Sequence, residues 1–528
     1  MGASDIPTLD PSLMQDVPSV QVASEFFPGL LNMHEETVEV GPGVATVDVS
    51  EDGTVFTFHI MDNIPWVHYN ADSGAVEQVM DESGNPRMLT AQDFYDSLVR
   101  TLDARTAGPY QYVLTPWIVG GAEFGAPDVA DADDATRQGL IDALGIKVID
   151  EHTLEVTAPI PSAVTQTIFT MWVTWAEPKW SVDENGEFWT EPENIATYGP
   201  YTLKEWVHGD GGSLTMVKNP FWPGTPNSPQ AKIDEVQFVF LDSEPQLANF
   251  EAGTLDVSEV PQSAVDRIRA DAGLSAALYT APGSCTYYYG FNVEDPPFDD
   301  PSVRLAFSEA IDRAAITENI TKSGQIPASF FSLPNLVAAP TEADYPGQGV
   351  YTNVEDAKAR WEAYLTAQGK TAADFSPTLV YNTSAAHEAI AQAIQQQWND
   401  VFGVNVQLTS EDFATYLDNR GTFNVFRAGW CFDYPDTNNF MNDAIESARD
   451  DFHWTNPDFE TLVDQALSAP TLQERRDLYA QAEHILVVTD AVMAPIYFYV
   501  TQDLTQPYVT RTHSLVTREV YEKWDINR

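Results

Sequence analysis

The sequence is poor in basic residues, which leaves it with a formal net charge of -53. Only 26 lysines and arginines stand against 79 aspartates and glutamates, and the acids are spread along the chain. Such a surface repels the phosphates of nucleic acids and anionic lipid headgroups, so neither partner is expected. Two interpretations of the acidity remain open: adaptation to a salty medium that screens like charges, or a field that attracts cationic ligands.

Long hydrophobic runs are also missing. No stretch of about 18 apolar residues exists, so no segment is predicted to span a membrane. The 528 residues are 43% hydrophobic and 12% aromatic, enough for large cores in two to four domains. The first residues, Met1–Pro7, have neither a basic nor an apolar region of the kind that directs export. If the protein is exported, we expect its export signal to have been removed. A cytoplasmic protein is the alternative.

The common catalytic motifs are absent as well. The sequence contains no G-x-S-x-G, P-loop, H-E-x-x-H or C-x-x-C motif, and its nine histidines are scattered. We therefore predict no cofactor, no metal site and no catalytic activity. A secreted acidic hydrolase with paired carboxylates stays a rival, because 79 acidic residues make any pairing uninformative without a structure.

Helical and strand-like patterns alternate along the chain, which favours α/β or α+β lobes. Apolar residues at helical spacing predict helices after Thr90, from Pro301, and through Ile390, Ile394 and Trp398 up to Gly403. Alternating or apolar runs predict strands over residues 56–60, 153–157, 233–241 and 404–408. Segments rich in Gly, Pro, Asn or Asp predict loops over residues 72–86, 209–212, 221–229 and 334–349.

Cysteine is almost absent, with only Cys285 and Cys431. On composition alone, two free buried thiols are expected. If the two are bridged, the closed loop is long enough to contribute roughly 5 kcal/mol of stability in the chain-entropy model. A bridge also implies an oxidising, extracytoplasmic compartment.

Both cysteines lie in motifs that resemble a known family. The relevant segments, in chain order, are Leu9–Pro11, Phe56–His59, Leu89–Phe94, Gly199–Trp206, Cys285–Tyr289, Pro296–Asp300, Asn382–Ser384, Arg427–Tyr434 and Pro495–Val500. Their order resembles that of the oligopeptide-binding proteins of bacterial ABC importers, known as extracellular solute-binding protein family 5. The resemblance covers nearly the whole chain.

The resemblance implies an α/β (α+β) fold of the two-lobed periplasmic-binding-protein clam type (class II, cluster C-like) with an extra flanking domain. The implied boundaries are lobe I at 1–27, 178–284 and 501–528, domain II at 28–177 and lobe III at 285–500. It further implies a Cys285–Cys431 disulfide and an extracytoplasmic monomer that is lipid-anchored in its full-length precursor. The implied partners are short peptides and the ABC permease and ATPase subunits at the membrane.

The resemblance also assigns ligand contacts. Arg427–Asp433 would form a strand edge, on which Gly429 and Cys431 offer main-chain hydrogen bonds to a peptide. Asp433 would hold the α-ammonium group, and Arg427 would serve the carboxylate for some peptide lengths. For an isolated Asp or Arg, a solvated surface role is the ordinary alternative.

The remaining assignments are less direct. Arg420 and His387 are further candidates for the peptide's C-terminus, with surface or helix-capping roles as the alternative. Trp430 and Tyr288 would line side-chain pockets or belong to the core. Tyr110 and Val17 match positions near the ligand in the family.

This chain departs from the family pattern in ways that bear on the ligand. Gly283 stands where a tyrosine is common, Gln15 where an acid is common, and residues 257–261 look shortened. Peptide length and pocket preference therefore stay open. An oligosaccharide or another solute on the same fold, and a peptide-binding sensor or chaperone, are the rival functions.

Overall fold

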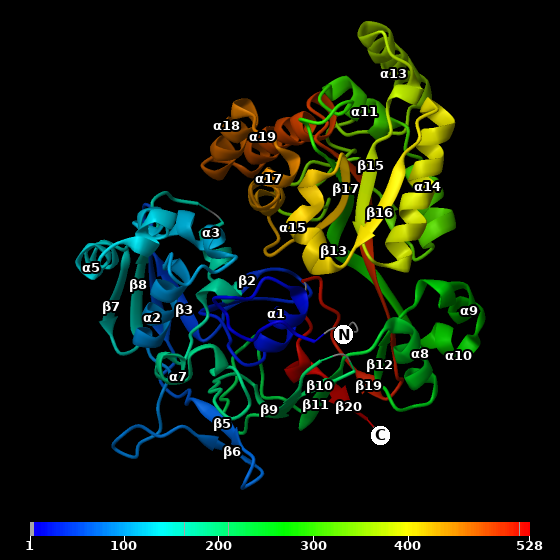
Figure 1. Ribbon diagram of the computed structural model, residues 1–528. Helices are drawn as coiled ribbons and strands as arrows, with labels where there is room; N and C mark the ends of the chain where they lie inside the picture. Colours follow the sequence, from blue (N-terminus) through cyan, green and yellow to red (C-terminus); the bar gives the residue numbers. More distant parts are fainter. Residues whose placement is uncertain (1–4, 163, 210, 517, 528) are drawn as a thin grey trace. The chain divides into compact units, whose positions relative to one another are not determined.

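The computed structural model describes residues 5–162, 164–209, 211–516 and 518–527. The chain divides into two compact units (Figure 1). Unit 1 comprises residues 1–259 and 504–528, and unit 2 comprises residues 260–503. Unit 1 is thus built from both ends of the chain. The finer division of unit 1 into lobe I and domain II stays a prediction.

Unit 1 contains short helices and several small antiparallel sheets. Its main helices are α1 (Val17–Ala23), α2 (Ala91–Leu102), α3 (Gln111–Leu114), α4 (Gly121–Phe124), α5 (Asp134–Asp142), α6 (Thr165–Ile168), α7 (Lys179–Asn185) and α8 (Ser243–Glu251). Its strands are β1 (Leu31–Met33), β2 (Val40–Pro42), β3 (Ala45–Val49), β4 (Val55–Ile60), β5 (Val67–Asn70), β6 (Ala75–Gln78), β7 (Ile146–Asp150), β8 (Thr153–Thr157), β9 (Tyr201–Val207), β10 (Ser213–Lys218), β11 (Glu235–Val239), β12 (Val257–Glu259), β19 (Val509–Thr510) and β20 (Asp525–Ile526).

The sheet β3-β4-β8-β7 carries the alternation predicted from the sequence. On β4, Phe56, Phe58 and Ile60 are buried, whereas His59 between them is exposed. Helix α2 begins where predicted, because the Thr90 and Asp93 side chains cap each other's backbone. The predicted helix and the two strands of this region are confirmed.

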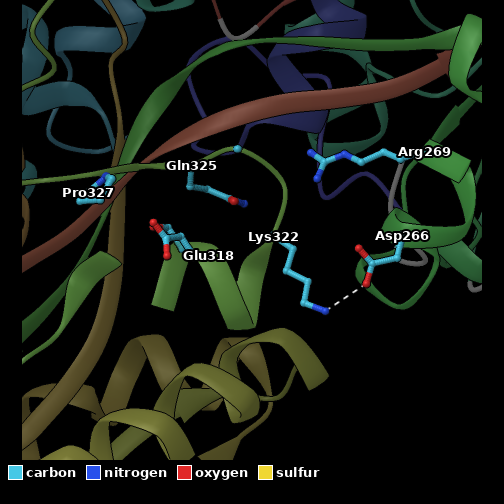
Figure 2. A pocket seen from close by; sticks show the side chains of 8 residues that line it. Asp266, Arg269, Glu318, Lys322, Gln325 and Pro327 are labelled. Atoms are coloured by element: carbon cyan, nitrogen blue, oxygen red, sulfur yellow. Dashed lines mark hydrogen bonds and ion pairs between the residues drawn. The ribbon is translucent and has the colours of Figure 1, made fainter. Parts of the chain in front are cut away.

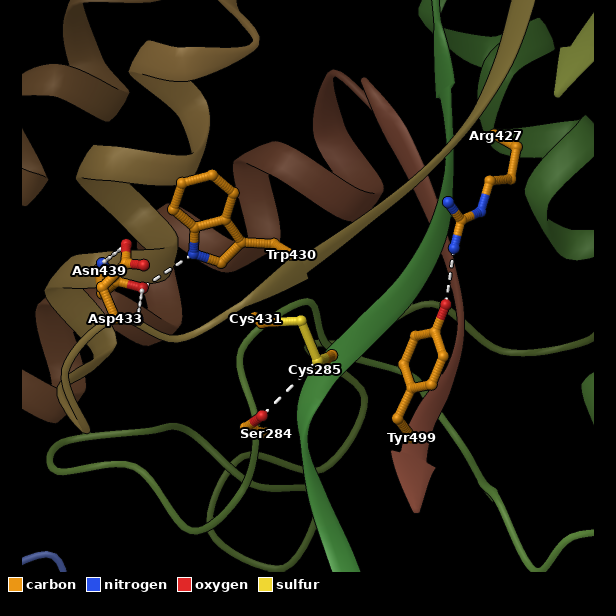
Figure 3. The surroundings of a disulfide bond; sticks show 8 residues. All are labelled: Ser284, Cys285, Arg427, Trp430, Cys431, Asp433, Asn439 and Tyr499. Atoms are coloured by element: carbon orange, nitrogen blue, oxygen red, sulfur yellow. Dashed lines mark hydrogen bonds between the residues drawn. A yellow bond between two sulfur atoms is a disulfide. The ribbon is translucent and has the colours of Figure 1, made fainter. Parts of the chain in front are cut away.

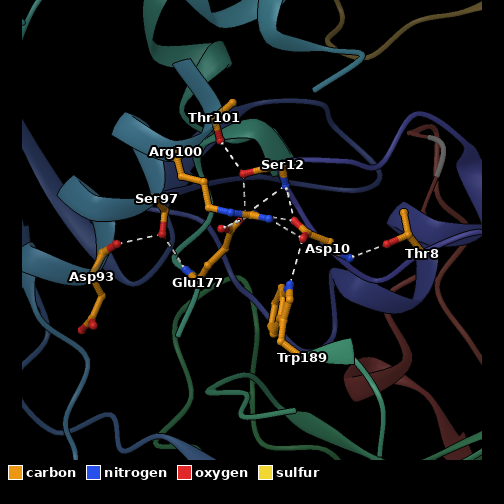
Figure 4. Close-up of polar contacts among 9 residues, drawn as sticks. All are labelled: Thr8, Asp10, Ser12, Asp93, Ser97, Arg100, Thr101, Glu177 and Trp189. Carbon is orange, nitrogen blue, oxygen red and sulfur yellow. Dashed lines mark hydrogen bonds and ion pairs between the residues drawn. The ribbon is translucent and has the colours of Figure 1, made fainter. Parts of the chain in front are cut away.

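A buried ion cluster fixes the segment before α1 to helix α2 (Figure 4). Arg100 on α2 lies 2.7 Å from an Asp10 oxygen and 2.6 Å from a Glu177 oxygen. The Trp189 indole donates to Asp10, and the Ser12 backbone and hydroxyl donate to Glu177. Because both carboxylates are almost fully buried, the single guanidinium is what makes their burial tolerable.

Unit 2 is built around one mixed sheet with helices packed against it. Its helices are α9 (Val265–Ala270), α10 (Ala272–Ala277), α11 (Pro301–Glu309), α12 (Arg313–Ala315), α13 (Val354–Gln368), α14 (Ala385–Phe402), α15 (Phe413–Asn419), α16 (Ala444–Ser447), α17 (Arg449–Phe452), α18 (Pro457–Leu467) and α19 (Leu472–His484). Its strands are β13 (Leu278–Phe291), β14 (Ile326–Pro327), β15 (Thr378–Asn382), β16 (Gln407–Glu411), β17 (Val425–Cys431) and β18 (Met493–Thr505). They follow the order β18-β13-β17-β15-β16, with β14 paired to β18.

The two helices predicted in this unit are confirmed. Asp300 caps α11 by accepting the Ser302 backbone N–H, and Pro301 occupies the first helical position. Helix α14 ends at Gly403, which has a left-handed backbone (φ +68°). The Trp398 indole of α14 donates to the Phe307 carbonyl of α11, so the apolar stripes of both helices meet in one core.

Two predicted boundaries were wrong. The strand expected over 404–408 is β16, which begins only at Gln407. The carbonyls of Val404 and Val406 instead accept hydrogen bonds from Asn399 and Gln395 side chains of α14, so they do not join the ladder. The loop expected over 72–86 contains strand β6, which pairs with β5 in a hairpin too polar to show an alternating pattern.

Within the described residues, no helix is both long and apolar enough to cross a lipid bilayer.

The ion cluster of unit 1 makes a test of stability possible. Replacing Arg100 by methionine should lower the free energy of unfolding by about 3–5 kcal/mol, because two buried carboxylates lose their counter-charge. Urea denaturation would measure the change. Lys179→Met, which breaks the exposed pair with Asp183, is the matched control and should cost less than about 1 kcal/mol. Equal losses in the two variants would show that the cluster contributes no more than a surface pair.

Candidate functional site

The site is organised by the antiparallel pair β13–β17, in which Cys285 lies opposite Cys431. The two cysteines form a disulfide, with Cα atoms 3.9 Å apart (Figure 3). Next to it, the Phe432 N–H donates to the Ser284 carbonyl across the two chains. This bond places Cys285 and Cys431 in a non-hydrogen-bonded pair of the ladder. The predicted disulfide is confirmed.

The register of β17 against β13 determines which backbone groups of β17 form no hydrogen bonds with β13. Because the direction of N–H and C=O groups alternates along a strand, those of Arg427, Gly429 and Cys431 point away from β13. On that other side, β15 pairs with β17 only through Val425 and Phe426. In the described part of unit 2, no strand continues this pairing, so residues 427–431 form an open strand edge.

Asp433 lies just beyond the end of this edge and is partly buried. The Asn439 side-chain amide donates to its carboxylate at 3.0 Å, and the Asn439 oxygen accepts the Asp433 backbone N–H (Figure 3). Burial, with the neighbouring Asp443 carboxylate adding to it, raises the pKa of Asp433 to about 7. Among the described side chains, no cation pairs with either carboxylate.

Arg427 presents the opposite charge at the start of the open edge. Its guanidinium donates to the Tyr499 hydroxyl at 2.6 Å and to the Asn382 side chain at 3.2 Å, and it lies 4.6 Å from the Tyr287 ring centroid. Its Nε has no hydrogen-bond partner. No carboxylate in the described residues pairs with it. Neutral groups therefore hold the charged guanidinium of Arg427, which still has N–H groups that can donate hydrogen bonds to an anion.

His387 joins the Arg427 cluster. This residue lies in the first turn of α14, and its Nδ1 is 3.5 Å from the hydroxyl of Tyr287 on β13. Burial and the Arg427 charge lower its pKa to about 3, so the ring is neutral near pH 7. The structure thus brings together two of the residues predicted for the carboxylate end.

Arg420 and the two aromatic candidates have partners within unit 2. Arg420 pairs with Asp451 at 2.6 Å, so its charge is already neutralised. Tyr288 is buried against Phe331. Trp430 is half-buried, and its indole donates to Asn439 at 2.8 Å, which places it beside Asp433.

Tyr110 and Val17 belong to unit 1. Tyr110 packs against Trp172 and Tyr112, with ring centroids 5.0 and 5.6 Å apart. Val17 begins α1 with 42% of its surface exposed. Their role near a ligand stays a prediction.

Sequence reasoning missed four residues that hold the predicted site together. Asn439 and Asp443 lie on a single helical turn and support Asp433, while Asn382 and Tyr499 hold Arg427. The i, i+4 spacing of Asn439 and Asp443 was the only local signal. Tyr499 lies 72 positions from Arg427, so only the sheet order brings them together.

A separate pocket of about 470 Å³ lies elsewhere in unit 2 (Figure 2). Residues that line it include Asp266, Arg269, Glu318, Lys322, Gln325 and Pro327. Lys322 and Asp266 pair at 3.0 Å, and no residue predicted to bind ligand lines the pocket. Across the described residues, no three His, Cys, Asp or Glu side chains gather as a metal site.

Comparison with known proteins identifies the family. The sequence model of the bacterial extracellular solute-binding proteins, family 5, matches residues 39–451. The chain belongs to this family. It is 31% identical to the periplasmic oligopeptide-binding protein OppA of Escherichia coli, over 96% of this chain and 88% of OppA. It is also 29% identical to a probable deoxycholate-binding periplasmic protein, YgiS, of the same organism, over 96% and 88% of the two chains.

Solved structures agree with this assignment. The murein tripeptide binding protein MppA of Escherichia coli superposes with a TM-score of 0.81 at 27% identity, covering 99% of this chain and 97% of MppA. The predicted mixed α/β, two-lobed periplasmic-binding fold is confirmed. Because YgiS and OppA are described as binding different solutes, the ligand has to be argued from the site.

The raised pKa of Asp433 predicts that this side chain destabilises the ligand-free protein. Its pKa rises from 3.8 to about 7 on folding, so the destabilisation is complete above pH 7 and disappears as pH falls toward 4. Asp433→Asn should therefore raise the free energy of unfolding by up to about 4 kcal/mol at pH 8, and by less than about 2 kcal/mol at pH 5. Urea denaturation of ligand-free protein at both pH values measures this. Asp464→Asn, on an exposed face of α18, is the control, and an equal effect of both variants would contradict the prediction.

Proposed function

We propose that this chain is the extracytoplasmic solute-binding receptor of an ABC importer, that it captures short peptides through their backbone and termini, and that it has no catalytic activity. It would act as a monomer, lipid-anchored in its precursor, and deliver peptides to a permease and its ATPase. The observation that carries the peptide assignment is one open strand edge with an unpaired anion, Asp433, at one end and a cation held only by neutral groups, Arg427, at the other.

This arrangement matches the chemistry that all peptides share. An extended peptide carries backbone donors and acceptors, which an open strand edge can pair with. Gly429 has no side chain beside this edge, where an added Cβ would be in van der Waals contact with Arg427 and the Thr286 carbonyl, each at 3.5 Å. Recognition through the backbone requires no particular peptide sequence.

The termini of a zwitterion complement the two unpaired charges. An α-ammonium group beside Asp433 forms a charge-assisted hydrogen bond in a partly desolvated site, where such bonds are stronger than in water. A sugar or a bile acid has no ammonium group and would leave the Asp433 carboxylate without a counter-charge. Asp433 therefore favours peptides over these solutes.

Amine capture can be tested by calorimetric titration. Protein stripped of bound peptide by unfolding and refolding should bind tri- to pentapeptides with free amines. N-acetylated peptides, and free peptides on Asp433→Asn, should bind on the order of 100-fold or more weakly, because one buried charge loses its partner. Asp464→Asn should bind like the wild type.

Equal binding of acetylated and free peptides would show that Asp433 does not recognise the amine. Absence of binding by any peptide would make oligosaccharides and bile acids the next panel. Release of shortened peptides during the titration, detected by mass spectrometry, would favour the hydrolase instead.

Capture of the carboxylate end has its own test. Arg427→Gln should weaken binding of peptides with a free C-terminus, while C-terminally amidated peptides should lose little, because they never had the ion pair. The affinity of Arg427→Lys for these peptides should lie between those of the wild type and Arg427→Gln, since lysine keeps the charge without the planar guanidinium group. Lys358→Gln, at an exposed position of α13, is the control. Equal weakening of acid and amide peptides would mean that Arg427 has only a structural role.

A further inference from the structure

The Asn439 amide behind Asp433 is fully occupied. It lies on the helical turn Asn439–Asp443. Its Nδ2 donates to Asp433 and to Asp443, each at 3.0 Å. Its Oδ1 accepts from the Trp430 indole at 2.8 Å and from the Asp433 backbone at 3.2 Å. Rotating the amide by 180° would turn its oxygen toward two carboxylates, so only one orientation is possible.

No cation among the described side chains pairs with either of the two carboxylates that share this amide. Asp443 is 4% exposed and also accepts from Asn442 at 2.8 Å, while the Tyr434 hydroxyl and Asp436 face it. Arg475 pairs with the neighbouring Asp436 at 2.7 Å, so its charge is already neutralised. Burial and the repulsion of like charges disfavour ionisation of both carboxylates, so without a cation the pair favours holding one proton.

We propose that Asp433, Asn439 and Asp443 form a proton-coupled ammonium site, which holds one proton on its carboxylate pair when empty and releases it when a ligand ammonium binds. The inference rests on the proposed function. On binding, the carboxylic acid of the pair loses its proton to the buffer. The ligand keeps its ammonium protons, and no bond in the peptide changes. Asn439 acts as a positioning residue that keeps the Asp433 oxygens aimed at the ligand.

The titration behaviour of the pair supports this coupling. The pKa of Asp433 is raised to about 7 and that of Asp443 to about 6, in both cases mainly by burial. The Asp443 charge contributes to the first shift, and the Asp436 charge contributes to the second. Below about pH 7 the empty site therefore carries a proton that a ligand has to displace. Above about pH 8 the peptide's own α-amino group loses its proton and has to regain it. Affinity should be highest between these limits.

The test counts protons. Titrating trialanine into the full chain at pH 6, in buffers of different ionisation enthalpy, gives the number of protons released from the slope of the binding heat. We expect a value close to one, and an affinity that falls about tenfold per pH unit below about pH 7. In Asp443→Asn the fall should begin at lower pH. In Asp433→Asn the release should disappear together with most of the affinity, and Asp464→Asn should behave like the wild type.

The outcomes separate the two proposals. Peptide binding at pH 6 with the same heat in every buffer would overturn proton coupling and leave peptide capture intact. A pH profile that Asp443→Asn leaves unmoved would remove Asp443 from the site. If Asp443→Asn does not fold, the proton count of the wild type still decides whether coupling exists. No binding at any pH would reject the proposed function itself.

Discussion

The register of β13 against β17 is the constraint on which the site depends. With Cys285 opposite Cys431, the alternation of the ladder turns the free backbone groups of Gly429 and Cys431 toward the open side. A slip of one residue would turn those groups toward β13 and move every side chain to the other face. The disulfide fixes this register at the end of the strand nearest Asp433.

In a chain with such an excess of acidic residues, an arginine without a carboxylate partner is unusual. Basic side chains are scarce in this chain, and carboxylates pair with many of them. Arg420 pairs with Asp451, for example, and Arg475 pairs with Asp436. Against a net charge of -53, the partly buried Arg427, held by tyrosines and an asparagine, is an exception. Asp433 is the matching exception, since it is an acid with no cation partner among the described residues. The acidity as a whole does not explain either of them.

Much of the fold could be predicted, because local signals agreed with it. The cap at Asp300, the stripe through Ile390 and the alternation around Phe58 each depend on neighbours within one helical turn or one strand. The strand expected over 404–408 failed because side chains of α14 take the carbonyls that a ladder would need. No local pattern records that competition. The assignment of Asp433 came from a resemblance, and its support by Asn439 became visible only once the chain had folded into a turn behind it.

A receptor site of this kind has to be unstable when empty. Each feature that prepares it for a ligand leaves something unsatisfied: an open edge, a desolvated carboxylate and a guanidinium nitrogen without a partner. The surrounding structure has to offset these costs through the buried helices and strands of unit 2. A ligand that pairs all three recovers these costs at once. Because it binds the folded state alone, it stabilises that state by an amount that grows with the logarithm of the ligand concentration. Affinity for a general feature such as a peptide backbone is thus obtained from what the protein leaves unpaired in itself, rather than from a close fit to any one side chain.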